Sequence, residues 1–252
     1  MKNKLSLCLS GGGARGLAHL GVAKYLVENN IAFSAISGTS AGAMIGAFLC
    51  DNFHPEEIEE IIIKQLKKPK INFANFKAGL LNINFLNDVL KNNLRTTLIE
   101  NLPIPLFVNA TNYQTGESVT FNSGNLIKTV LASSSIPIVF EPIYIDGIPY
   151  VDGGLSCNLN VSPFINNSDK IIGINVNPVI NYDKKLSIVN QIDRLIQLSI
   201  KENSFLNIKH CGYYIEPKEL VKYGIFDTNK TQEIIKIGYD TSVNYFKVNP
   251  II

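Results

Sequence analysis

The pentapeptide Gly38-Thr39-Ser40-Ala41-Gly42 follows a run of β-forming residues and opens a strongly apolar, helix-forming stretch. Glycines on both sides of a serine permit a sharp, strained turn between a strand and a helix. Such a turn holds the serine hydroxyl at its tip, beside the positive end of the helix dipole. Ser40 is therefore a candidate nucleophile, and a tight structural turn with Ser40 as a helix cap is the alternative.

A second glycine motif, Gly11-Gly12-Gly13-Ala14-Arg15-Gly16, also lies between an expected strand and an expected helix. The backbone N–H groups of such a loop can converge on an anion. In an acyl hydrolase that anion is the oxyanion of the tetrahedral intermediate. The loop also fits the glycine pattern of dinucleotide-binding folds, but those need an acidic residue after the second strand, where this chain has Ser37-Gly38. A non-catalytic module that binds an anion or a nucleotide remains an alternative.

The third motif is Asp152-Gly153-Gly154, which follows a β-type run. Two glycines after an aspartate allow a tight turn that leaves the carboxylate uncrowded. The order Ser40, Asp152, His210 matches the nucleophile, acid and histidine of α/β-hydrolases, so a Ser40-Asp152-His210 triad is a further alternative. Against it, only one strand–helix unit precedes the Ser40 strand, whereas α/β-hydrolases place several strands before the nucleophile.

In this order the three motifs resemble those of the patatin-like phospholipases. The stretches Ala132-Ser133-Ser134-Ser135-Ile136-Pro137 and Phe140-Glu141-Pro142 are similar to the family's approach to its Asp-Gly-Gly motif. Gly238-Tyr239 in the last expected helix resembles bacterial members. The resemblance covers about residues 5–165 and weakens beyond them.

The resemblance implies a Ser–Asp dyad and assigns a role to each motif. Ser40 would attack the acyl carbonyl and Asp152 would take its proton directly. Gly11, Gly12 and Gly13 would form the oxyanion hole, with the amides of the last two as donors and the first shaping the loop. Supporting roles fall to the remaining motif residues, which are Arg15 (bracing the loop or meeting a lipid phosphate), Gly16, Gly38, Gly42, Gly153 and Gly154.

The fold that the resemblance implies is α/β, a three-layer α/β/α arrangement with a mainly parallel central sheet. Residues 5–165 would be the catalytic core, and residues 166–252 a C-terminal α/β extension that completes the same domain. The substrate would be an acyl ester, a glycerolipid or its lyso form, processed through an acyl-enzyme, with acyl transfer as the alternative outcome. Dyad chemistry needs no metal and no cofactor. The apolar neighbours of Ser40 either line an acyl pocket or face the core: Ala41, Ala43, Met44 and Ile45.

The elements that must position these motifs follow from hydrophobic periodicity. Strand, glycine turn and helix occur twice in succession near the N-terminus, which is typical of a parallel α/β sheet. The second strand is expected to stop at Ser37-Gly38. The expected strands cover residues 4–9, 31–36, 106–110, 117–121, 143–151 (a hairpin), 170–175 and 212–216. The expected helices cover residues 17–28, 40–50, 55–68, 84–100, 124–132, 186–206 and 229–246.

Composition narrows the classes of partner. The chain has 252 residues, 46% of them apolar, which is enough for one large domain. Its net charge is +2 with scattered lysines, so a nucleic-acid partner is not expected. Four separated cysteines without a ligand pattern indicate free thiols in a reducing compartment.

No apolar run approaches the about 20 residues that span a bilayer, so a soluble cytoplasmic protein is expected. Residues 69–84 mix Lys with Phe and Leu, which suits transient contact with an anionic membrane surface; a lid or a plain surface loop is the alternative. The oligomeric state stays open.

Overall fold

The computed structural model describes residues 5–66, 83–166, 170–179 and 188–251. Its strands are β1 (Leu5–Leu9), β2 (Phe33–Thr39), β3 (Leu106–Asn112), β4 (Ser118–Phe121), β5 (Ile143–Ile145), β6 (Ile148–Asp152), β7 (Lys170–Ile174) and β8 (Tyr213–Ile215). Its α-helices are α1 (Ala18–Glu28), α2 (Ala41–Cys50), α3 (Pro55–Leu66), α4 (Ile83–Asn93), α5 (Leu126–Ser133), α6 (Ile188–Ile208) and α7 (Thr231–Val248).

These strands form one mixed sheet in the order β5-β6-β3-β2-β1-β7-β8, with β4 also paired to β3. The run from β3 through β2, β1 and β7 to β8 is parallel. Strands β4 and β6 are antiparallel to β3, and β5 is antiparallel to β6. The sheet is thus mainly parallel, as the fold class expected from the sequence requires.

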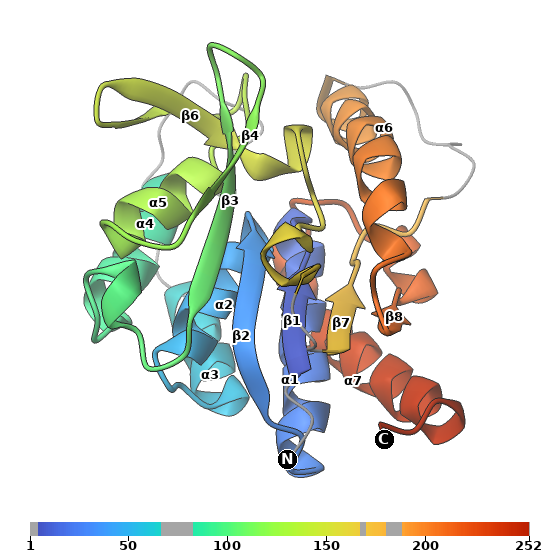
Figure 1. Cartoon of the computed structure of the whole chain (residues 1–252). Helices are drawn as coiled ribbons and strands as arrows, with labels where there is room; N and C mark the ends of the chain where they lie inside the picture. The colour runs from blue at the N-terminus through green and yellow to red at the C-terminus, as the bar shows by residue number, and fades with distance from the viewer. Residues whose placement is uncertain (1–4, 67–82, 167–169, 180–187, 252) are drawn as a thin grey trace.

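Alternating side chains of β1 separate the two cores of the protein. Leu5, Leu7 and Leu9 pack with residues of α1, α2 and α7 on one face. Cys8 points to the other face, into a smaller cluster with Phe164. The segment after β6 and helix α6 cover that second face, so the sheet lies between two layers of covering structure (Figure 1). This is a three-layer α/β/α architecture.

Two of the predicted elements differ in the structure, and one predicted segment cannot be compared. Strand β2 continues through Gly38 to Thr39 instead of stopping at Gly38, because it stays paired with β3 to its last residue. Residues 84–100 are not one helix: α4 ends at Asn93, where the Asp51 carboxylate takes hydrogen bonds from the amides of Arg95 and Thr96. Residues 69–82 of the membrane-contact or lid segment lie outside the described residues.

Candidate active site

The turn between β2 and α2 carries Ser40 at a strained backbone conformation. Its φ of 52° and ψ of −119° lie in a region that residues with a Cβ rarely adopt. The flanking glycines are needed because a Cβ at Gly38 would lie 2.6 Å from the carbonyl oxygen of Gly42. A Cβ at Gly42 would lie 2.3 Å from the Leu9 carbonyl oxygen. The motif therefore forms the strand–turn–helix that its sequence predicts.

Asp152 ends β6, whose antiparallel register places it opposite Ala110 of β3. From there its carboxylate reaches the tip of the β2–α2 turn. The Ser40 hydroxyl donates a hydrogen bond of 2.7 Å to Asp152 Oδ2, and the amide of Gly154 donates one of 2.8 Å to Oδ1. Gly153 makes the sharp turn possible, because a Cβ there would lie 2.3 Å from the carbonyl oxygen of Asn109. The structure thus brings together the two residues predicted to form the dyad.

Burial dominates the electrostatics of this carboxylate. It raises the pKa of Asp152 to about 6, against the lowering effect of the hydrogen bonds from Ser40 and from the amide of Gly154. A carboxylate of that basicity is still ionised at neutral pH. It is also a better proton acceptor than an ordinary aspartate, because its pKa lies closer to the working pH.

The glycine loop lines the same pocket as Ser40 and Asp152. Within the described residues, the amides of Gly12 and Gly13 have no hydrogen-bond acceptor. The amide of Gly11 is engaged, because it donates to Asn158 Oδ1 at 3.1 Å. The Ser40 amide is engaged as well, by Ser133 Oγ at 2.8 Å. The two amides predicted as oxyanion donors are therefore the two of the loop that remain available.

Arg15 lies inside the protein, with 2% of its surface exposed. Its Nε donates to the Tyr223 carbonyl oxygen at 2.7 Å, and Nη1 donates to Asn177 Oδ1 at 3.4 Å. Of the two roles that the resemblance implied, these internal hydrogen bonds of a buried guanidinium favour bracing the loop. Gly16 lets the loop approach α2: a Cβ there would lie 2.4 Å from the Cβ of Ala41.

Within the described residues, no histidine side chain forms a hydrogen bond with Ser40 or Asp152. His210 is exposed and precedes the N-terminal end of β8, whereas Ser40 follows the C-terminal end of β2. Because these strands run parallel in the sheet, the two residues lie at opposite ends of the strands. His54 is exposed as well. His19 is buried with Nε2 against the Ser10 carbonyl oxygen at 2.8 Å, and burial lowers the pKa of His19 to about 4. The geometry therefore does not support the Ser40-Asp152-His210 triad.

Two pockets meet at Ser40. One extends between α2, α3 and the segment after α5, and its lining is mainly apolar, including Leu17, Met44, Ile62, Leu66, Leu86, Ile136, Phe140 and Phe226. The other lies between the glycine loop, Asp152 and α6. Among the four apolar neighbours of Ser40, Ala41 and Met44 line the first pocket, whereas Ala43 and Ile45 are core residues.

Residues of the site that the sequence did not reveal include Asn158, Asn177 and Ser133. The Ser133 hydroxyl donates to the Asn109 carbonyl oxygen at 2.6 Å while it accepts from the Ser40 amide. Asn177 donates to the Gly11 carbonyl oxygen at 2.6 Å. The one available signal for Asn177 was its place just after a buried strand, because polar residues there meet at the carboxyl edge of a parallel sheet.

Comparison with known proteins decides the family. The profile of the patatin-like phospholipases matches residues 7–165. The chain belongs to the patatin-like phospholipase family. A patatin-like fold is also seen in the crystal structure of VipD from Legionella pneumophila. The superposition includes 98% of this chain and 67% of the VipD chain, with a TM-score of 0.58 and 16% sequence identity.

The similar sequences in this family include an uncharacterised NTE family protein of Mycobacterium tuberculosis, 34% identical over 181 residues. That match covers 69% of this chain and 49% of the relative, so this chain spans about half the length of that protein. A lysophospholipase of Mycosarcoma maydis is 30% identical over 173 residues, which are 63% of this chain and 9% of the fungal protein.

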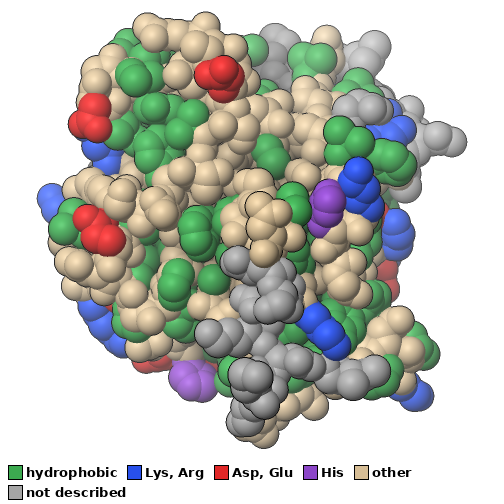
Figure 2. All heavy atoms as spheres, in the orientation of Figure 1, with side chains coloured by type: hydrophobic (Ala, Val, Ile, Leu, Met, Phe, Trp, Pro, Cys, Tyr) green, Lys and Arg blue, Asp and Glu red, His purple; other side chains and the backbone are tan. Residues whose placement is uncertain are grey.

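The described residues were also compared with the requirements of a metal site, a membrane-spanning helix, a disulfide and a basic surface patch. Among the described residues, no group of His, Cys, Asp and Glu side chains is arranged to hold a metal ion. No helix in the described part of the chain combines the length and the hydropathy needed to cross a bilayer. Cys8 and Cys50 are buried thiols, and Cys157 and Cys211 are half-buried ones. On the face shown in Figure 2, the described Lys and Arg side chains are scattered toward the sides of the molecule.

Proposed function

We propose that the chain is a serine acyl hydrolase that cleaves carboxylic esters of lipids, with Ser40 as nucleophile and Asp152 as its base. The observation that carries the proposal is the 2.7 Å hydrogen bond from the Ser40 hydroxyl to the buried carboxyl group of Asp152. Both groups lie beside two backbone amides that have no other acceptor in the described residues. Nucleophile, base and oxyanion donors are the parts that acyl transfer to a serine requires.

The reaction follows from these groups. The Ser40 oxygen bonds to the acyl carbon as its proton passes to Asp152, and the carbonyl oxygen becomes an oxyanion held by the amides of Gly12 and Gly13. Collapse of the intermediate breaks the ester bond, and the departing alcohol takes the proton from Asp152. Water then gives its proton to Asp152 and attacks the acyl-enzyme. Release of the fatty acid returns the proton to Ser40.

The apolar lining of the first pocket suits the acyl chain of a lipid substrate. The pocket between α2 and α3 offers Met44, Ile62 and Leu86 to an apolar chain whose carbonyl lies at Ser40. The second pocket opens from the same serine past Leu155 and Leu195. It would take the alcohol side of the ester. Burial of methylene groups in the first pocket contributes about 0.8 kcal/mol each, so longer acyl chains should bind more tightly.

The test is an ester panel run on wild type and three variants. We expect Ser40→Ala and Asp152→Asn each to lower the hydrolysis of p-nitrophenyl esters and lysophospholipids by about a thousandfold or more. His210→Ala should keep most of the activity, because that side chain is exposed and lies at the far edge of the sheet. Labelling by a fluorophosphonate probe, followed by mass spectrometry, should locate the adduct on Ser40. Retention of activity in Ser40→Ala would sink the proposal.

A further inference from the structure

Both polar groups of Gly11 are held by buried asparagines from distant parts of the chain. Its amide donates to Asn158 Oδ1 at 3.1 Å, and its carbonyl oxygen accepts from Asn177 Nδ2 at 2.6 Å. The carbonyl of Gly11 and the amide of Gly12 belong to one planar trans peptide, so they point in opposite directions. The donor on the Gly11 carbonyl therefore sets the direction of the Gly12 amide, which is one of the two proposed oxyanion donors.

Asn177 also packs directly on the loop. A Cβ at Gly12 would lie 2.6 Å from Val176 Cγ2 and 3.1 Å from Asn177 Oδ1, so this side of the loop rests on the segment that follows β7. Asn177 is only 2% exposed, which means that water does not substitute easily for its hydrogen bonds. The loop can turn only if these contacts are broken.

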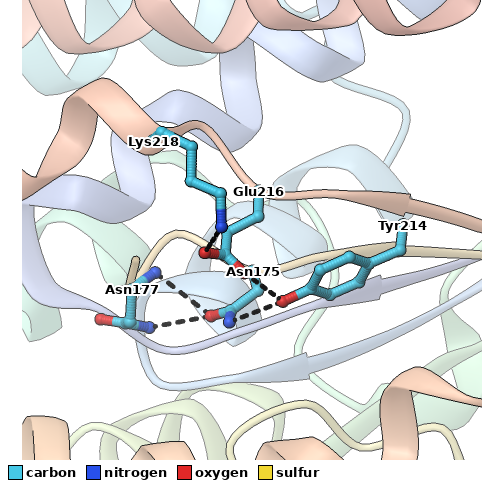
Figure 3. A network of polar contacts seen from close by, with 5 residues as sticks. All are labelled: Asn175, Asn177, Tyr214, Glu216 and Lys218. Carbon is cyan, nitrogen blue, oxygen red and sulfur yellow. Dashed lines mark hydrogen bonds and ion pairs between the residues drawn. The ribbon is translucent and has the colours of Figure 1, made fainter. Parts of the chain in front are cut away.

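A chain of hydrogen bonds leads from Asn177 to the surface (Figure 3). Asn175 Oδ1 accepts from the Asn177 amide at 3.1 Å and from its Nδ2 at 3.4 Å, and Asn175 Nδ2 donates to the Tyr214 hydroxyl at 3.0 Å. That hydroxyl donates to Glu216 Oε2 at 2.6 Å. Glu216 forms an ion pair with Lys218 at the outer end.

The groups at the two ends of this hydrogen-bond network allow only one orientation of the Asn177 side-chain amide. The Arg15 guanidinium can only donate, so it faces Asn177 Oδ1. The Glu216 carboxylate can only accept hydrogen bonds, so the Tyr214 hydroxyl donates its proton to it. The same hydroxyl then accepts a hydrogen bond from the NH2 group of Asn175. The oxygen of Asn175 is then turned toward the NH2 group of Asn177, which is thereby presented to the Gly11 carbonyl. An arginine on one side and a glutamate on the other thus exclude the flipped amide.

We propose that Asn177 is a positioning residue, which aims the Gly12 amide at the oxyanion through its hydrogen bond to the Gly11 carbonyl, and that Asn175, Tyr214 and Glu216 hold it in the required orientation. This inference rests on the proposed acyl hydrolase function. It assigns a catalytic consequence to a hydrogen-bond network whose outer end, at Lys218, lies at the surface. Prearranged donors stabilise the transition state and not the bound ester, so the effect belongs on kcat and not on KM.

The decisive variant is Asn177→Leu, which keeps the shape of the side chain and removes its donor. We expect kcat for a p-nitrophenyl ester to fall by about a hundredfold, as loss of one oxyanion donor does, with KM little changed. The inhibition constant of a long-chain trifluoromethyl ketone, which forms an oxyanion on the serine, should rise by the same factor as kcat/KM falls. Tyr214→Phe interrupts the hydrogen-bond network farther from the loop. It should also lower kcat and raise this inhibition constant, but by smaller factors than Asn177→Leu.

The matched control is Asn160→Leu. Asn160 is also buried, but its Nδ2 donates to Thr120 Oγ1 at 2.8 Å and not to the glycine loop. It should lose thermal stability as Asn177→Leu does while kcat stays near that of wild type. If Asn177→Leu does not fold, Tyr214→Phe decides in its place.

Ser40→Ala in the same assay separates the two proposals. If Ser40→Ala is inactive but Asn177→Leu, or Tyr214→Phe in its place, keeps the kcat and the inhibition constant of wild type, the positioning role is overturned and the hydrolase function stands. If Ser40→Ala retains the wild-type rate, the hydrolase function fails, and the positioning role that rests on it fails as well.

Discussion

At the scale of single residues, the basicity of Asp152 makes a kinetic prediction. Burial raises the pKa of this carboxylate to about 6, and only its ionised form can accept the Ser40 proton. We therefore expect kcat/KM to rise with pH, to reach half of its maximum at about pH 6, and to stay level above that value. The measurement is a pH–rate profile on a soluble ester between about pH 4 and pH 9. A profile already flat at about pH 5 would mean that the base has an unshifted carboxylate pKa.

The same carboxylate should lower the stability of the folded protein. The pKa of Asp152 is raised from 3.8 to about 6, so the folded state holds the proton more tightly than the unfolded state does. Folding then takes up a proton between these values, and the free energy of unfolding falls as the pH rises through them. Above about pH 6 the ionised group costs up to about 3 kcal/mol, at 1.36 kcal/mol per pKa unit.

Asp152→Asn removes this cost and keeps a hydrogen-bonding side chain of the same shape. The variant should be more stable than wild type at about pH 8, and the two should converge below about pH 4, where the aspartate is protonated. Thermal or urea unfolding at a series of pH values measures the difference. Equal stability of the two proteins at every pH would show that burial of the charge costs nothing. A gain in stability at the expense of activity is common at active sites.

At the scale of elements, α2 contains two glycines that differ in how much space a Cβ atom would have. A Cβ at Gly42 would lie 2.3 Å from the backbone oxygen of Leu9, which cannot move without distorting β1. The atoms nearest to a Cβ at Gly46 all belong to side chains, the first two being Ile36 Cγ2 at 3.1 Å and Leu106 Cδ1 at 3.2 Å. We expect Gly42→Ala to lower stability by about 1–3 kcal/mol and to abolish activity. Gly46→Ala should cost less, because the atoms that its Cβ meets belong to side chains that need to shift by only a few tenths of an ångström. The gain of about 1 kcal/mol in helix propensity offsets part of that cost.

Chemical denaturation and an ester assay on the two alanine variants give the comparison. The helix is the same and the substitution is the same, so helix propensity contributes equally to both. If Gly42→Ala folds and reacts as Gly46→Ala does, the close approach of α2 to β1 is not required for the site.

The sequence predicted the elements around the motifs well, because each strand–turn–helix unit is a local pattern. It placed Ser40 between β2 and α2 and Asp152 at the end of a hairpin strand. It did not predict that β6 runs antiparallel beside β3, which is what carries Asp152 to the serine. Asn158 and Asn177 were also out of reach. Their partner Gly11 lies 147 and 166 residues away in the chain, and no periodicity records a contact of that kind.

At the scale of the whole molecule, the last helix is joined tightly to the first. A Cβ at Gly238 of α7 would lie 2.0 Å from the carbonyl oxygen of Ala18 in α1, so the two backbones touch at this point. Helix α1 directly follows the glycine loop. We expect Gly238→Ala to lower the free energy of unfolding by about 1–3 kcal/mol and to reduce activity through displacement of α1.

Gly212→Ala is the matched control for this contact. The atom nearest to a Cβ at Gly212 is 3.8 Å away, which is ordinary van der Waals contact, so stability should change by less than about 0.5 kcal/mol. Calorimetric unfolding of both variants, together with ester turnover, measures the effect. An unchanged midpoint in Gly238→Ala would argue against a rigid α1–α7 contact. The family profile ends at residue 165, so such a contact would also tie residues beyond the matched region to the site.

Strand β1 is completed by partners on both sides, and one of them comes late: Leu5 pairs with Phe33 and also with Lys170. A polypeptide emerging from the ribosome makes its serine turn early but cannot close the sheet on the other side of β1 until Lys170–Ile174 has been synthesised. The asparagine that holds the glycine loop is synthesised later still. We expect the nascent chain to be unreactive toward esters throughout that interval, so that reactivity arises only after Asn177 has joined the fold.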